Sequence, residues 1–276
     1  MSSSRVALAT GITVRVVRAG DPARAPIVLL HGWGVHAYMW RRNIGALVAA
    51  GRHVIAVDLP GHGLSDRPLA PGSYTVDAFA RHIVALFDAL GVTRAPIVGQ
   101  SMGGRIAIEV ARSQPSRVAS LVLFGSVGLG EVPAMVALAP RLPVPETSVS
   151  TLLVRRWLIA LSKAAAYGTR RRPDRADVDA YWAPTQFPEF LAAARQAMIE
   201  FDWRPLAPEV LATIATPALV VFGTRDRTVR PLHTEALVGA MPHGRLAWIR
   251  DAGHVANEEA DDEVNSLLVQ FIVRAD

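Results

Sequence analysis

Short apolar runs alternate with helical spacing along most of this chain. A segment that alternates apolar and polar positions, residues 12–17, predicts an exposed strand. Near-continuous runs of Val, Ile and Leu are typical of strands buried on both faces of a mostly parallel sheet. Such runs occur at residues 27–30, 54–57, 97–98, 121–124 and 219–222.

Helical patterns lie between these predicted strands. Residues 76–90 carry apolar side chains at three- and four-residue spacing, and Gly91 follows as a helix-ending residue. Residues 102–113 and 255–273 show the same spacing. Because strands and helices alternate in this way, the pattern predicts a doubly wound α/β sheet.

The alternation stops between residues 127 and 205. This stretch is rich in proline and arginine, yet residues 150–166 and 189–201 keep helical spacing. We expect a mainly helical insertion at 127–205, which divides the core into residues 1–126 and 206–276. The arginine-rich segment 170–175 within the insertion predicts a mobile loop.

Length and composition favour one large globular domain that carries this insertion. The chain has 276 residues, with 51% hydrophobic and 19% charged residues, which excludes intrinsic disorder. It contains no run of 18 apolar residues, and its first residues are too polar for a signal peptide. We therefore expect no membrane span and a cytoplasmic location.

The charge and the cysteine count remove several other classes of function. No cysteine is present, which excludes disulfide scaffolds, thiolate metal sites and cysteine nucleophiles. The net charge is +5, but acidic residues are interspersed with the basic ones, so we expect no nucleic-acid partner. The histidines show no metal-ligand spacing, and we expect neither a metal nor a cofactor.

Residues 99–103 read Gly-Gln-Ser-Met-Gly, which is the G-x-S-x-G pattern of a nucleophile elbow. The pattern follows a predicted strand and opens a predicted helix, as the motif requires. Glycines on either side of Ser101 avoid clashes in a sharply bent backbone. Ser101 is therefore the candidate nucleophile.

A serine nucleophile needs a base and an acid that orients the base. In this architecture they follow the serine in the order acid, then histidine. Asp226 comes just after the strand predicted at 219–222, and His254 comes just after a last strand at 246–249. We assign Asp226 as the acid and His254 as the base, and we keep Asp251 as a weak substitute for the acid.

The reaction also needs backbone N–H donors for an oxyanion. One donor should be Met102, directly after the nucleophile. The other should come from the loop after the strand at 27–30, which reads His-Gly-Trp-Gly, and we assign it to Trp33. We expect His31 to hold this loop in place rather than to act as a second base.

Together these motifs resemble the α/β-hydrolase superfamily, in the branch with a helical cap. The resemblance rests on residues 31–34, 58–66, 99–104, 223–226 and 251–254. It implies an α/β-hydrolase fold, with a mostly parallel sheet, helices on both faces and the insertion at 127–205 as the cap. The loop at 58–66 is usually structural in this family. Gln100 is a departure, since His or Asn is frequent in relatives there.

The resemblance implies a serine hydrolase that cleaves a carboxylic ester or lactone of a mainly apolar small molecule through an acyl-enzyme. A C–C bond hydrolase of the meta-cleavage dienoate type is the first alternative. A ligand-binding or accessory protein without catalysis is the second. Epoxide hydrolases and haloalkane dehalogenases, which are similar in fold, use an aspartate nucleophile, so Ser101 argues against those activities.

The cap should shape the substrate pocket, for which Gln100, Trp157 and Phe187 are candidate lining residues. The arginines between residues 155 and 175 could dock an acidic carrier protein or a carboxylated substrate. A solvated face in an arginine-rich chain is the simpler interpretation of them. The sequence leaves the oligomeric state open.

Overall fold

The computed structural model describes residues 1–133 and 154–275. Within them, eight strands form one sheet in the order β1-β2-β4-β3-β5-β6-β7-β8. β1 and β2 pair antiparallel, β2 also pairs antiparallel with β4, and all later neighbours are parallel. The strands are β1 (Ser2–Ala7), β2 (Thr13–Ala19), β3 (Pro26–Leu30), β4 (His53–Val57), β5 (Ala95–Gln100), β6 (Val118–Phe124), β7 (Ala218–Gly223) and β8 (Gly244–Ile249).

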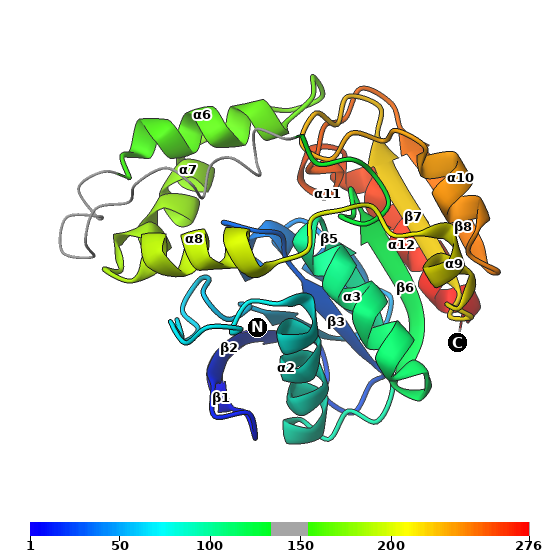
Figure 1. Cartoon of the computed structure of the whole chain (residues 1–276), viewed down its shortest axis with the longest axis horizontal. Coiled ribbons are helices and arrows are strands. Elements are labelled where there is room, and N and C mark those ends of the chain that lie inside the picture. The colour runs from blue at the N-terminus through cyan, green and yellow to red at the C-terminus, as the bar shows by residue number, and fades with distance from the viewer. Residues whose placement is uncertain (134–153, 276) are drawn as a thin grey trace.

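Helices cover both faces of the sheet and also form a separate layer above it. Figure 1 shows α2 and α3 in front of the sheet and α12 behind it. The helices are α1 (Ile44–Ala49), α2 (Val76–Ala89), α3 (Met102–Ser113), α6 (Arg156–Ala166), α7 (Arg175–Trp182), α8 (Phe190–Glu200), α9 (Pro208–Ala212), α10 (Thr234–Gly239), α11 (Ala256–Glu259) and α12 (Asp261–Ala275). Short 3-10 helices occur at Ala37–Trp40, Pro115–Arg117 and Ala183–Gln186.

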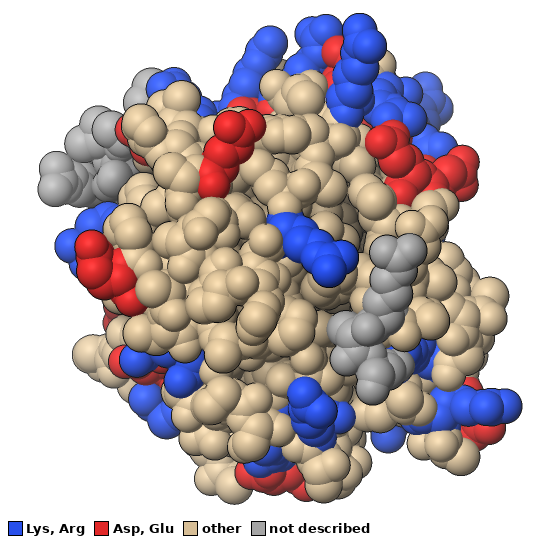
Figure 2. Space-filling model, turned by 90° about the vertical axis from the view of Figure 1, so that its right-hand side faces the viewer, with Lys and Arg blue, Asp and Glu red and all other residues tan. Residues whose placement is uncertain are grey.

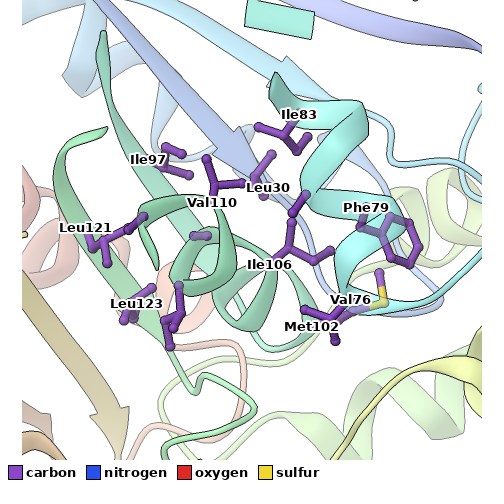
Figure 3. Close-up of a cluster of buried hydrophobic side chains, with 14 of the residues drawn as sticks. Leu30, Val76, Phe79, Ile83, Ile97, Met102, Ile106, Val110, Leu121 and Leu123 are labelled. Atoms are coloured by element: carbon purple, nitrogen blue, oxygen red, sulfur yellow. The ribbon is translucent and has the colours of Figure 1, made fainter. Parts of the chain in front are cut away.

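The buried strands supply a core on each face of the sheet because successive side chains point to opposite sides. In β3, Val28 and Leu30 join the cluster under α2 and α3, whereas Ile27 and Leu29 join the cluster on the α12 side. Figure 3 shows the first cluster, in which Leu30 lies among apolar side chains of α2 and α3. This two-sided burial explains why the strands read as unbroken apolar runs.

The predicted doubly wound sheet is confirmed, with two local differences. β1 was not predicted, since it lies at the sheet edge and most of its side chains are exposed or only partly buried. The single helix predicted at 255–273 is wrong, because it is divided into α11 and α12. At Ala260 the backbone has φ −127° and ψ 46°, which leaves the helical region.

The helices α6, α7 and α8 follow β6 and precede β7, and they lie over the top of the sheet in Figure 1. The cap boundaries at 127 and 205 remain a prediction. The helix predicted at 150–166 begins at Arg156, because residues 154–155 are not helical and residues 150–153 lie outside the described residues. In the part of the chain that the structure describes, no helix has the length and apolar character needed to cross a membrane.

The segment predicted as a mobile loop forms ion pairs with α12, and its mobility stays a prediction. Arg170 pairs with Glu263 at 2.5 Å, and Arg171 pairs with Asp261 at 2.7 Å. Both acids lie in the first turn of α12. Arg175 begins α7, whose N-terminus is closed by a capping box. This segment of the chain therefore lies next to the start of α12.

Candidate active site

Ser101 lies at a sharp turn between β5 and α3, with φ 53° and ψ −115°. Such backbone is costly for a residue with a Cβ and is characteristic of a nucleophile elbow. The glycines two residues before and after it are required because the backbones there approach too closely for a side chain. A Cβ on Gly99 would overlap the carbonyl of Gly103, and a Cβ on Gly103 would overlap the carbonyl of Leu30.

His254 and Asp226 form a buried pair, with 2.8 Å between His254 Nδ1 and Asp226 Oδ2. The other carboxylate oxygen, Oδ1, accepts the backbone N–H groups of Thr228 and Val229, each at 2.9 Å. Because both oxygens are occupied as acceptors, the carboxylate is fixed in orientation and favours a proton on His254 Nδ1. His254 Nε2 is then the unprotonated nitrogen that can accept a proton.

The backbone around Gly125 brings the elbow and this pair together. Ser101 N donates to Phe124 O at 2.8 Å. A Cβ on Gly125, the next residue, would lie 2.9 Å from both Asp226 Oδ2 and His254 Nδ1. Ser101 and His254 also line the same cavity. Gly125 was missed by the sequence analysis, although its position directly after a buried strand was a usable signal.

Asp251, the weak substitute for the acid, has a different partner. Its carboxylate pairs with Arg225 at 2.8 Å and is partly exposed. Its backbone has φ 61°, and its N–H donates to Thr224 Oγ1 at 2.9 Å. Asp251 therefore shapes the loop before His254, while Asp226 contacts the imidazole.

The two expected oxyanion donors lie on elements that touch each other. Met102 begins α3, so its N–H belongs to the first helical turn, which has no intrahelical acceptor. Trp33 lines the cavity beside Ser101, and its indole Nε1 donates to Ala194 O of α8 at 3.0 Å. Since Gly103 lies against the carbonyls of Leu30 and His31, the loop that carries Trp33 lies against the elbow.

His31 has the structural role that was expected. Its Nε2 accepts the Leu59 N–H at 2.8 Å, so Nδ1 carries the proton and donates to Gly32 O at 2.7 Å. Burial, followed by the nearby His62, lowers the pKa of His31 to about 3. A histidine that stays neutral with both nitrogens occupied cannot also serve as the base.

The loop at 58–66 is likewise built for structure. Asp58 is fully buried and accepts the backbone N–H groups of Ala37 at 2.8 Å and Leu64 at 2.9 Å. Burial alone would raise the pKa of Asp58, but the nearby His36 and these hydrogen bonds hold it below its usual value. Asp58 is not among the described residues that line the cavity at Ser101.

A largely apolar cavity of about 490 Å³ adjoins Ser101, and residues of α6 and α8 contribute to its wall. Gln100 lines it and donates from Nε2 to the carbonyl of His254 at 3.1 Å. The described lining residues are Trp33, Gly34, Val35, Gln100, Ser101, Val127, Val132, Val154, Leu158, Ile159, Ser162, Lys163, Ala165, Ala166, Tyr181, Phe190, Leu191, Met198, Trp203, Thr228, Val229, His254 and Val255.

Trp157 and Phe187, both expected in the pocket, are not among these lining residues. Trp157 is 64% exposed on the outward side of α6, whose other side contributes Leu158 and Ile159 to the cavity. The Phe187 ring instead lies under the guanidinium of Arg67, at 4.3 Å. The apolar spacing of α6 could not show which of its sides faces the sheet.

A buried ionic cluster beside the cavity was missed by the sequence analysis. Glu258 contacts Lys163 Nζ at 2.8 Å, Arg41 at 2.5 Å and the hydroxyl of Tyr181 at 2.9 Å. Burial would raise the pKa of Glu258, but the two cations outweigh it and lower the pKa. Lys163 is the only lysine in the sequence, and that was the available signal.

No group of three or more His, Cys, Asp or Glu side chains suited to a metal ion occurs among residues 1–133 and 154–275. The expected absence of a metal and a cofactor remains a prediction. The groups at the cavity are a hydroxyl, an imidazole with a carboxylate partner, and main-chain N–H groups at a helix start. Groups of these kinds are suited to nucleophilic acyl chemistry.

Comparison with known proteins agrees with this architecture. A family model described as alpha/beta hydrolase fold matches residues 25–261. The chain is 32% identical to the dihydrolipoyllysine-residue acetyltransferase component of the acetoin cleaving system of Pseudomonas putida, over 95% of this chain and 67% of that protein. It is 31% identical to a 2-hydroxy-6-oxononadienedioate/2-hydroxy-6-oxononatrienedioate hydrolase of Klebsiella pneumoniae, over 96% of this chain and 92% of that enzyme.

Among solved structures, a meta-cleavage product hydrolase from Pseudomonas fluorescens is similar, with a TM-score of 0.77 and 27% identity. The match covers 99% of this chain and 98% of that one. Fold, family match and relatives above 30% identity agree along nearly the whole length. This chain therefore belongs to the alpha/beta hydrolase fold family.

Proposed function

We propose that this protein is a serine hydrolase that cleaves a carboxylic ester or lactone of a neutral, mainly apolar small molecule. Ser101 is the nucleophile, His254 the general base and acid, and Asp226 the acid that orients it. The N–H groups of Trp33 and Met102 form the oxyanion hole. The observation that carries the proposal is that Ser101 and the paired His254 line one apolar cavity.

The reaction begins when Ser101 Oγ attacks the substrate carbonyl and His254 Nε2 takes the hydroxyl proton. The carbonyl oxygen becomes an oxyanion that accepts the two backbone N–H groups. The C–O bond to the alcohol then breaks, and His254 returns the proton to the leaving oxygen. Water, activated by His254, releases the acid from Ser101 in the same two steps.

The charges around the cavity favour a neutral substrate. Besides His254, Lys163 is the only ionisable side chain with a cationic form among the described lining residues. Its ammonium is already paired with the fully buried Glu258. A substrate carboxylate would therefore meet no free cation in this part of the wall, and burying it unpaired would be costly.

C–C bond hydrolysis is the second candidate, and the relatives favour it. The Klebsiella pneumoniae enzyme is named for a dienedioate substrate, and the similarity spans 96% of this chain. An assay that compares a p-nitrophenyl butyrate with a 2-hydroxy-6-oxo-dienoate separates the two candidates. We expect the larger kcat/KM for the ester, and the opposite order would overturn the ester assignment.

A labelling experiment, together with the ester assay, tests whether the protein is an enzyme. A fluorophosphonate probe should label the wild type and fail to label Ser101→Ala, which should also lose nearly all ester turnover. Wild-type protein that is neither labelled nor active on either substrate would support the non-catalytic alternative.

An acidic carrier protein at the cap arginines has less support than a small-molecule substrate. Arg156, Arg170 and Arg171 already pair with Asp179, Glu263 and Asp261. In the face shown in Figure 2, the basic side chains along the upper edge lie next to acidic ones. Because their charges are already paired, these arginines present less net positive charge to an acidic partner.

A further inference from the structure

We propose that Glu259 is a positioning residue that joins the cap to the loop carrying His254, so that the placement of the cap sets the geometry of the base. The inference rests on the proposed function, in which His254 is the base. It concerns a carboxylate that touches neither the cavity nor the imidazole.

Glu259 lies at the end of α11 and is 3% exposed. Its Oε2 accepts the backbone N–H of Gly253 at 2.8 Å and of Gly168 at 2.9 Å, and its Oε1 accepts that of Arg170 at 3.1 Å. One carboxylate thus receives three backbone N–H groups. Two of them belong to the chain directly after α6 of the cap, and the third belongs to the residue before His254.

The two backbones that Glu259 joins are in direct contact. A Cβ on Gly168 would overlap the carbonyl of Asp251, and a Cβ on Gly253 would overlap the carbonyl of Ala166. Thr169 N donates to Asp251 O at 2.9 Å. Glycine at positions 168 and 253 is therefore what allows the cap segment to lie against this loop.

The main chain of His254 itself is held from both sides. Its N–H donates to Ala166 O of the cap at 2.7 Å, and its carbonyl accepts Gln100 Nε2 beside the elbow at 3.1 Å. In the part of the chain that the structure describes, the imidazole has a hydrogen bond only to Asp226. Its distance from Ser101 therefore depends on where these backbone bonds put the Cα. Glu259 holds the cap backbone that accepts the His254 N–H.

This arrangement has a consequence for catalysis. A small displacement of a catalytic group lowers the rate steeply, because proton transfer requires close and aligned atoms. Loosening the contact should therefore reduce chemistry at Ser101 while leaving the apolar walls that bind substrate in place. We expect kcat to fall and KM to change little.

The test compares Glu259→Ala, Glu259→Gln and Gly168→Ala with Glu263→Gln. Glu263 pairs with the Arg170 side chain at the surface, and among residues 1–133 and 154–275 it forms no hydrogen bond or ion pair with the His254 loop. Its variant is therefore the matched control. Gly168→Ala pushes the same two backbones apart while Glu259 stays intact. The readouts are kcat and KM for p-nitrophenyl butyrate and the second-order rate of fluorophosphonate labelling, well below each variant's melting temperature.

We expect Glu259→Ala and Gly168→Ala to lose at least about tenfold in kcat and in labelling rate, with KM within about threefold of wild type. Glu259→Gln keeps one acceptor oxygen and should fall between them and wild type. Glu263→Gln should match wild type.

Folded variants that keep the wild-type kcat and labelling rate, and lose only thermal stability, would overturn the proposal. Should Glu259→Ala fail to fold, Glu259→Gln and Gly168→Ala decide the question alone. Failure of the proposed function looks different, because the wild type itself would then show neither labelling nor ester turnover.

Discussion

Replacing Asp226 by asparagine tests the assignment of the orienting acid. Asp226 Oδ1 accepts two backbone N–H groups, from Thr228 and Val229, and Oδ2 faces His254 Nδ1. In the variant, the amide oxygen should take the place of Oδ1, because an amide NH₂ there would face two donors. The NH₂ group is then forced toward His254.

An NH₂ group at that position donates a hydrogen bond to His254 Nδ1, so the imidazole must carry its proton on Nε2. This is the wrong tautomer for taking a proton from Ser101. The same change in a serine protease triad lowers kcat by about 10⁴-fold, which corresponds to about 5 kcal/mol of transition-state free energy. Since the backbone donors here fix the amide orientation, we expect a loss of similar size.

The assay is kcat/KM on p-nitrophenyl butyrate at pH 7.5, with circular dichroism to confirm that Asp226→Asn is folded. Asp251→Asn is the control, since Asp251 is near His254 in sequence but pairs with Arg225. We expect the control to stay within about threefold of wild type, as for a surface ion pair. A loss of less than about tenfold in a folded Asp226→Asn protein would refute the assigned role.

Three further predictions follow from burial and packing. Gly103→Ala places a Cβ against the carbonyls of the expected oxyanion loop. The free energy of unfolding, measured by urea titration, should fall by at least about 1–3 kcal/mol. Gly45 lies in open space, so Gly45→Ala should not lower it. Burial lowers the pKa of His31 to about 3, so protonation favours the unfolded chain and the melting temperature should fall below pH 6.5. His31→Gln should flatten this pH slope, and an unchanged slope would contradict the burial argument. Leu191 lies in the cavity wall, so Leu191→Ala should raise KM for the ester. Trp157 is exposed, so Trp157→Ala should leave kcat and KM unchanged. Equal effects of the two variants would show that the cavity is misassigned.

The sequence by itself determined every strand of the sheet except β1, the chain order of the candidate triad and the expected elbow. Parallel strands buried on both faces must be continuously apolar, so five of them were visible as runs. The elbow was visible because its glycines are dictated locally, by close approach of the backbones around Ser101. The strand β1 escaped notice because an exposed edge leaves little apolar signal.

Only the tertiary structure decided which side of each cap helix faces the cavity and what surrounds the base. Trp157 and Leu158 are adjacent in sequence, and a helix turns one toward solvent and the other toward the cavity. The contact of Glu259 with Gly168 joins residues 91 positions apart. Almost any residue type can donate a backbone N–H, so the sequence does not reveal which residue accepts or donates such a hydrogen bond. The spacing of apolar residues shows which side of a helix or strand is buried. It does not show which other element packs against that side, because this depends on how the whole chain folds.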